Sequence, residues 1–131
     1  EGRCAVAFMN GADAPVDVDC VPSCIYTSPE IASVGLTADE AKEKGLEVVS
    51  KKYPMSANGK TVLSLQERGF IKVIADKETG KVLGAQMMCA RATDMISQFA
   101  QAIVNGLTLD DMSRVIYPHP TFSEGIGEAV R

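Results

Sequence analysis

Two neighbouring segments of almost continuous apolar, β-prone residues constrain the fold of this chain most. They span residues 70–75 and 82–90, and a polar connection over residues 76–81 joins them. Gly80 in this connection can adopt the positive φ that such a hairpin loop requires, so the two segments are predicted to pair as antiparallel strands. Because both strands are apolar at nearly every position, both of their faces are expected to be covered.

Helices are predicted after this hairpin. The strongest spans residues 93–105, because its apolar residues repeat at helical spacing, and Gly106 ends it. Thr108 then begins a second short helix with Asp111 at the capping-box position, and residues 121–130 are predicted to form a third. The apolar positions of the first helix and its end are Ile96, Phe99, Ala100, Ile103, Val104 and Leu107.

Shorter elements are predicted before the hairpin. Pro29 lacks an N–H group, so the segment around it forms either an edge strand or two short strands with a break. Thr37 and Glu40 have capping-box spacing at the start of a short helix. The predicted elements are turn-rich chain over 1–22, strand over 24–34, helix over 37–44, strand over 46–53, and a loop with one helical turn over 55–68. This order predicts an α+β fold, an antiparallel β-sheet covered by helices.

Composition excludes several classes of function. With 131 residues, 46% of them hydrophobic, the chain has the composition of one soluble globular domain. Its net charge of −4 argues against nucleic acid as a partner, because no basic stripe is visible. No apolar run reaches the roughly 18 residues that a membrane-spanning helix needs, so no membrane partner is expected.

The cysteines are predicted to be free, partly buried thiols. Cys4, Cys20, Cys24 and Cys89 lie too far apart in the sequence, or at the wrong spacing, for a zinc site or the two-residue redox motif. No metal is therefore expected, and reduced thiols favour a cytoplasmic localisation. The chain also starts in mid-pattern without an initiator Met, which favours a fragment of a larger protein over a trimmed small one.

One segment has residues suited to acid–base chemistry. Pro118 and Pro120 flank the only histidine, His119, and restrict its backbone, and an imidazole titrates near neutral pH. Glu124 could accept a hydrogen bond from one ring nitrogen and fix the tautomer, as a carboxylate does in a catalytic triad. Thr121 and Glu124 also have capping-box spacing, so a plain helix cap is the alternative, and one carboxylate should not serve both partners fully.

A catalytic His119 would need help from outside this sequence. The chain contains no Gly-rich phosphate loop, no nucleophile elbow and no cluster of metal ligands. The substrate or nucleophile would therefore come from another chain or from missing sequence.

Three segments together resemble a known family. They are Tyr-Thr-Ser-Pro-Glu-Ile-Ala-Ser-Val-Gly-Leu-Thr over residues 26–37, the strand segment starting at Gly84, and His-Pro-Thr-Phe-Ser-Glu over residues 119–124. The chain resembles the C-terminal interface (dimerisation) domain of the FAD-dependent pyridine nucleotide–disulfide oxidoreductases, and among them the dihydrolipoamide dehydrogenases. On this resemblance, residues 1–20 are the tail of a preceding FAD-binding region and residues 21–131 are the interface domain.

The resemblance implies a role for the histidine segment in a homodimer. His119, held by Glu124, would reach the partner subunit's active site and act there as base and then acid while dihydrolipoamide attacks a redox disulfide. Electrons would pass to FAD and then to NAD⁺. His119 and Pro120 would lie near the partner's FAD, with a cis peptide bond between them. The full-length enzyme would also bind the lipoyl domain of 2-oxo acid dehydrogenase complexes. On this resemblance, the acid–base pair is favoured over the plain helix cap.

The chain departs from the family in lacking the dinucleotide fingerprint and the redox disulfide. The fragment alone is therefore expected to be inactive, without bound FAD or NAD. Excess apolar surface on the two central strands predicts self-association. Three alternatives remain: another disulfide oxidoreductase of the same family, a purely structural dimerisation module, and an independent small α+β binding domain.

Overall fold

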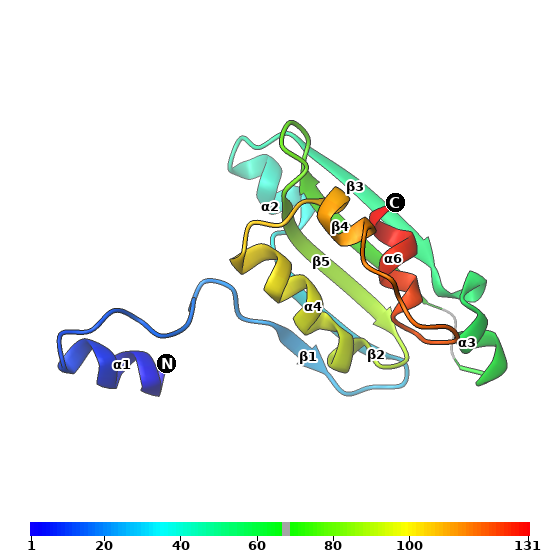
Figure 1. Cartoon of the computed structure of the whole chain (residues 1–131), viewed down its shortest axis with the longest axis horizontal. Coiled ribbons are helices and arrows are strands. Elements are labelled where there is room, and N and C mark those ends of the chain that lie inside the picture. Colours follow the sequence, from blue (N-terminus) through cyan, green and yellow to red (C-terminus); the bar gives the residue numbers. More distant parts are fainter. Residues whose placement is uncertain (67–68) are drawn as a thin grey trace.

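A computed structural model describes residues 1–66 and 69–131 of the chain. Its centre is one five-stranded sheet with the strand order β1-β2-β5-β4-β3, in which every neighbouring pair is antiparallel (Figure 1). The predicted α+β fold is confirmed. The strands are β1 (Ser23–Ile25), β2 (Glu30–Gly35), β3 (Val48–Pro54), β4 (Phe70–Asp76) and β5 (Val82–Cys89).

The central hairpin of β4 and β5 forms as predicted. Gly80 has a φ of +73°, and the Asp76 carboxylate accepts hydrogen bonds of 2.7 Å from both the N–H and the hydroxyl of Thr79. These contacts close the turn, so the two apolar strands can pair over their length. The break at Pro29 is also confirmed, because β1 and β2 are separate strands on either side of a cis Ser28–Pro29 peptide bond.

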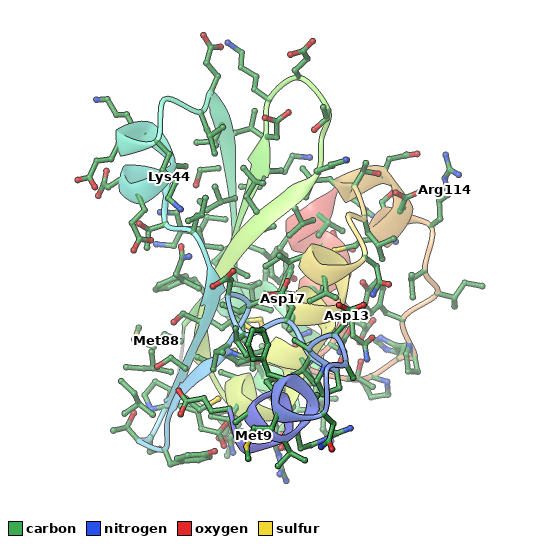
Figure 2. The ribbon with its side chains drawn as sticks, turned by 90° about the vertical axis from the view of Figure 1, so that its left-hand side faces the viewer. Met9, Asp13, Asp17, Lys44, Met88 and Arg114 are labelled. Atoms are coloured by element: carbon green, nitrogen blue, oxygen red, sulfur yellow. The ribbon has the colours of Figure 1, made fainter. Side chains whose placement is uncertain are left out.

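The three helices that follow β5 lie on one side of the sheet. Figure 2 shows α4, α5 and α6 on one side, with Met88 of β5 on the other. On that other side α2 lies near one end of the sheet (Figure 2). The helices are α1 (Gly2–Met9), α2 (Ala38–Glu43), α3 (Gly59–Leu63), α4 (Ala92–Val104), α5 (Leu109–Ser113) and α6 (Glu124–Val130). None of the helices in residues 1–66 and 69–131 is long and apolar enough to cross a membrane.

The core lies between the sheet and α4 and α6. Ile71, Phe99 and Ile126 are all 0% exposed there. Within this chain only one face of the two strands is well covered: Met88 and Phe70, which share a row on the other face, are only half-buried. The reason is that the three helices following β5 all lie on the same side of the sheet. Because successive side chains along a strand point to opposite faces, every second residue is buried under these helices and its neighbours lie on the more open face.

The apolar stripe predicted for α4 is partly wrong at its C-terminal end. Val104 is 54% exposed and Leu107, beyond the helix, is 38% exposed, whereas Phe99 is fully buried. The helix itself and its stop at Gly106, which has a φ of +62°, are confirmed. Ala102 and Ile103 at the same end of the helix do pack inwards, Ile103 beside Gly35 of β2, so Val104 lies at the edge of the buried stripe rather than on it.

Two predictions about irregular chain need correction. Residues 55–68 contain more structure than a single turn: a 3₁₀ helix, η1 (Met55–Ala57), is followed by α3, whose first N–H groups are capped by Asn58. The end of the predicted loop, residues 67–68, lies outside the described residues. The turn-rich N-terminal stretch begins instead with α1, which has no buried residue and lies apart from the sheet in Figure 1.

Candidate acid–base site

His119 lies in the connection between α5 and α6. The His119–Pro120 peptide bond is cis, as expected. The predicted third helix starts later than residue 121, because α6 begins at Glu124 with Ser123 as its N-cap residue. Residues 121–123 therefore form a turn that brings the start of α6 back towards the histidine.

The structure brings His119 and Glu124 into direct contact. Oε1 of Glu124 lies 2.9 Å from Nδ1 of His119, and Oε2 accepts a hydrogen bond of 2.8 Å from the Thr121 N–H. The His119 side chain is 76% exposed, whereas that of Glu124 is 26% exposed. The carboxylate is thus fixed at the surface of the fold, and the imidazole projects from it.

The two alternatives for Glu124 turn out not to exclude each other. The sequence predicted that one carboxylate would not serve both partners fully, yet each of its oxygens takes one of them. The capping box itself is incomplete: the Thr121 hydroxyl donates to the Pro118 carbonyl at 2.7 Å instead of capping α6. One turn thereby holds the backbone on both sides of His119.

The charge of Glu124 determines the proton position on the imidazole. The Thr121 N–H and then the His119 ring hold the pKa of this carboxyl below its ordinary value of 4.5, so it is ionised at neutral pH. An ionised carboxylate only accepts hydrogen bonds, so Nδ1 of His119 must carry the proton that it donates. In the neutral imidazole, Nε2 then presents its lone pair away from Glu124 and can accept a proton.

Two glycines of α6 pack closely against residues that adjoin the histidine segment or lie in η1. A Cβ atom at Gly127 would lie only 2.6 Å from the Tyr117 ring, and one at Gly125 would lie 2.6 Å from the Met55 sulfur. Tyr117 directly precedes Pro118, so this contact fixes the chain as it enters the site. The sequence analysis did not identify these glycines, although two glycines inside a predicted helix are an unusual enough pattern to have indicated close packing.

Two of the thiols, those of Cys20 and Cys89, are not activated for chemistry. Burial raises the pKa of the Cys89 thiol to about 12, and burial followed by the nearby Asp17 charge also raises that of Cys20. A thiol with a raised pKa is a poor nucleophile at neutral pH. All four cysteines are free, and the described part of the chain contains no group of three or more potential metal ligands.

FAD is the cofactor that the family resemblance implies. A dinucleotide is held where a parallel strand meets the N-terminus of a helix through a Gly-rich turn. Across residues 1–66 and 69–131 the strands pair only in antiparallel fashion, so these residues do not fit a site that holds FAD within this chain.

Comparison with known proteins identifies the class to which this fold and site belong. Residues 21–130 match the family described as pyridine nucleotide-disulphide oxidoreductase, dimerisation domain, and the chain belongs to that family. Among its curated relatives, a dihydrolipoyl dehydrogenase of Bacillus subtilis is 46% identical over 98% of the chain. The mitochondrial dihydrolipoyl dehydrogenase of Canis lupus familiaris is 39% identical over 98% of it.

Solved structures agree with this assignment. LpdA from Mycobacterium tuberculosis superposes with a TM-score of 0.90 at 27% identity, over 99% of this chain and 28% of its own. The HOCl-induced flavoprotein disulfide reductase RclA from Escherichia coli gives a TM-score of 0.87 at 25% identity, over 98% of this chain and 30% of its own. The chain spans 27% of the Bacillus subtilis relative and 25% of the canine one.

Proposed function

We propose that this chain is the dimerisation domain of a longer, FAD- and NAD-dependent dihydrolipoyl dehydrogenase, and that His119 and Glu124 are its acid–base pair. The observation that carries the proposal is the contact of 2.9 Å between Nδ1 of His119 and an ionised Glu124, which leaves Nε2 free. The high identity to proteins named dihydrolipoyl dehydrogenase supports this substrate over those of other family members. In the longer chain, FAD would take electrons from a redox disulfide and pass them to NAD⁺.

The proposed role of the pair is proton transfer. Nε2 of His119 accepts the proton of a dihydrolipoamide thiol, and the resulting thiolate attacks the disulfide, forming a mixed disulfide and releasing one thiolate. Glu124 stabilises the imidazolium formed in this step, because its carboxylate faces the newly charged ring. The proton held on Nε2 can then return to a departing thiolate.

The exposure of the pair favours action on a partner subunit. His119 is 76% exposed, and its ring projects from a turn whose other side is fixed to α6. The two cysteines of this chain with raised pKa values do not suit the role of its target. A homodimer in which each His119 completes the other subunit's disulfide site accounts for a base that is fixed by its neighbours yet projects from the surface of its own subunit.

Substitution of the histidine tests the proposal in the longer enzyme. His119→Gln should reduce lipoamide-dependent NAD⁺ reduction by about 10²–10⁴-fold, the usual contribution of a general base. Activity with an electron acceptor that bypasses the disulfide should change little. A loss smaller than tenfold would instead favour a purely structural dimerisation module, in which Glu124 serves as a helix cap through Thr121.

A hybrid dimer tests whether the base acts across the interface. One subunit would carry His119→Gln, and the other would lack the redox disulfide. If His119 acts on its partner, this dimer retains one complete site and about half of the normal activity. If it acts within its own subunit, neither site is complete and the hybrid is inactive.

The remaining parts of the proposal concern the surroundings of the domain. Residues 1–20 would belong to the FAD-binding region and residues 21–131 to the interface domain. The lipoyl domain of a 2-oxo acid dehydrogenase complex would deliver the substrate to the longer enzyme. Free cysteines support a cytoplasmic location, because they suit a reducing compartment.

A further inference from the structure

We infer that Asn58 is a positioning residue for the His119–Glu124 pair. Its side chain links the start of α3 to the turn that carries the pair, 63 residues further along the chain. The consequence for catalysis rests on the proposed function, whereas the positioning itself can be measured without any activity.

Asn58 is a buried polar side chain whose hydrogen bonds point in two directions. It is 2% exposed, and the other buried polar residue among those described is its partner Thr61, at 3%. Oδ1 of Asn58 accepts hydrogen bonds from the N–H and the hydroxyl of Thr61, at 2.9 and 3.0 Å. Nδ2 donates to the Thr121 carbonyl at 2.9 Å. The Thr61 N–H identifies Oδ1 as the acceptor, so Nδ2 must face Thr121.

The bond to Thr121 continues directly to the acid–base pair. The Thr121 carbonyl accepts from Asn58, and the Thr121 N–H donates to Oε2 of Glu124, whose Oε1 faces His119. Both peptide groups adjoining the Thr121 Cα are therefore held by side chains. Loss of the Asn58 bond would free one of these groups to rotate, and the carboxylate would lose its fixed position relative to the ring.

A second observation places α3 beside the histidine itself. A Cβ atom at Gly59, the residue after Asn58, would lie 4.0 Å from Cε1 of His119. The first turn of α3 therefore lies next to the ring, about one methyl group away from contact. Asn58 fixes this turn through its cap and the histidine turn through its amide, so one side chain sets the distance between them.

The tautomer of His119 reports this positioning. Because His119 is the only histidine, its ring nitrogens give a single set of ¹⁵N resonances in the 131-residue chain. With the pair intact, the neutral ring should carry its proton on Nδ1, facing Glu124. A neutral histidine side chain without a partner favours the proton on Nε2, so displacement of the carboxylate should shift the signal in a known direction.

Two substitutions of Asn58 remove the amide donor but keep the helix cap. Asn58→Ser and Asn58→Asp both retain an oxygen that can cap α3. Each should lower the ratio of Nδ1–H to Nε2–H tautomer by at least threefold. In the longer enzyme they should lower kcat for lipoamide about tenfold with little change in KM.

Thr61→Val is the matched control. It removes a hydrogen bond of similar length to the same Asn58 side chain but leaves the bond to Thr121. The tautomer ratio should stay that of the parent chain. If both folded Asn58 variants kept the parent ratio, or if Thr61→Val shifted it equally, the inference would be overturned.

A measurement on the unsubstituted chain covers the case in which neither Asn58 variant folds. The Nδ2 protons of Asn58 should exchange with solvent at least tenfold more slowly than those of exposed Asn10, because they are buried and bonded to Thr121. Equal exchange rates would overturn the inference. Either result is independent of the His119→Gln experiment, which tests catalysis alone.

Discussion

Glu30 should contribute strongly to stability, because it caps a helix that belongs to another part of the chain. α4 begins after Arg91, which has a left-handed φ of 62° and provides no side-chain cap. Glu30 at the start of β2 supplies the missing acceptor instead. Its Oε2 accepts hydrogen bonds from the N–H of Thr93, at 2.9 Å, and from the Thr93 hydroxyl, at 2.6 Å. β2 and β5 are neighbours, so this carboxylate reaches the helix that follows β5.

The expected magnitude follows from these bonds. Loss of an N-cap acceptor costs about 1 kcal/mol, and loss of a negative charge at a helix N-terminus costs about 0.3–1 kcal/mol. Glu30→Ala removes both and leaves the Thr93 N–H without its partner, so it should lower the free energy of unfolding by about 2 kcal/mol. Glu30→Gln keeps an acceptor and should cost about half as much.

The effect should depend on pH. The hydroxyl and then the N–H of Thr93 hold the pKa of Glu30 below its ordinary value of 4.5 in the folded chain. Because the pKa is lower in the folded chain than in the unfolded one, the stabilisation is fully present above pH 4.5. It disappears as the pH falls through the pKa that Glu30 has in the folded chain. The difference between the parent chain and Glu30→Gln should therefore be constant from pH 7 to about pH 5.5 and shrink below pH 4.5.

Urea denaturation followed by circular dichroism at several pH values measures this difference. Glu78→Gln is the control, since Glu78 is also a glutamate but lies exposed in the turn between β4 and β5. It should change the free energy of unfolding by less than about 0.5 kcal/mol. Glu30 does not cap α4 as described if Glu30→Ala lowers the free energy of unfolding no more than this control does. The same holds if the difference in this free energy between the parent chain and Glu30→Gln persists unchanged at pH 3.

Three further substitutions or reactions test other parts of the structure. Gly127→Ala should displace the Tyr117 ring and cost about 1–2 kcal/mol despite the better helix propensity of alanine, and a more stable variant would contradict the observed close contact. Cys89 should react with a thiol reagent at pH 8 only after unfolding, because burial raises its pKa to about 12, and rapid labelling of the native chain would refute this. Phe99→Ala should cost about 3–5 kcal/mol in urea denaturation, whereas Val104→Lys should cost less than about 0.5, and comparable losses would contradict the burial assigned to α4.

Local sequence patterns determined a large part of the fold. The β4–β5 hairpin, α4 and the capping boxes of α2 and α5 all depend on residues a few positions apart, and all four formed where they were predicted. Glu40 and Asp111 each return to the backbone N–H of the threonine three residues before them. Such interactions need no knowledge of the rest of the chain, because the helix geometry itself brings the two groups together.

Local sequence patterns predicted only part of the candidate site. His119 and Glu124 are five residues apart, and their proximity followed from the sequence together with the family resemblance. Spacing alone did not reveal that the two oxygens of the Glu124 carboxylate point at different groups. The sequence also placed Val104 in the core, since periodicity indicates a face of a helix but not how wide its buried stripe is.

Only the tertiary structure decided the contacts that join distant segments. Asn58 meets Thr121 and Glu30 meets Thr93 across 63 residues in each case. In the sequence, Asn58 fell in a predicted loop and Glu30 in a predicted strand. Their roles depend on the strand order and on where α3 and α4 begin, and buried or capping polar groups must find partners wherever the packed chain supplies them. Sequence patterns therefore specified most of the central elements and, with the family resemblance, pointed to His119 and Glu124, whereas the packing of those elements determined what holds these two side chains in place.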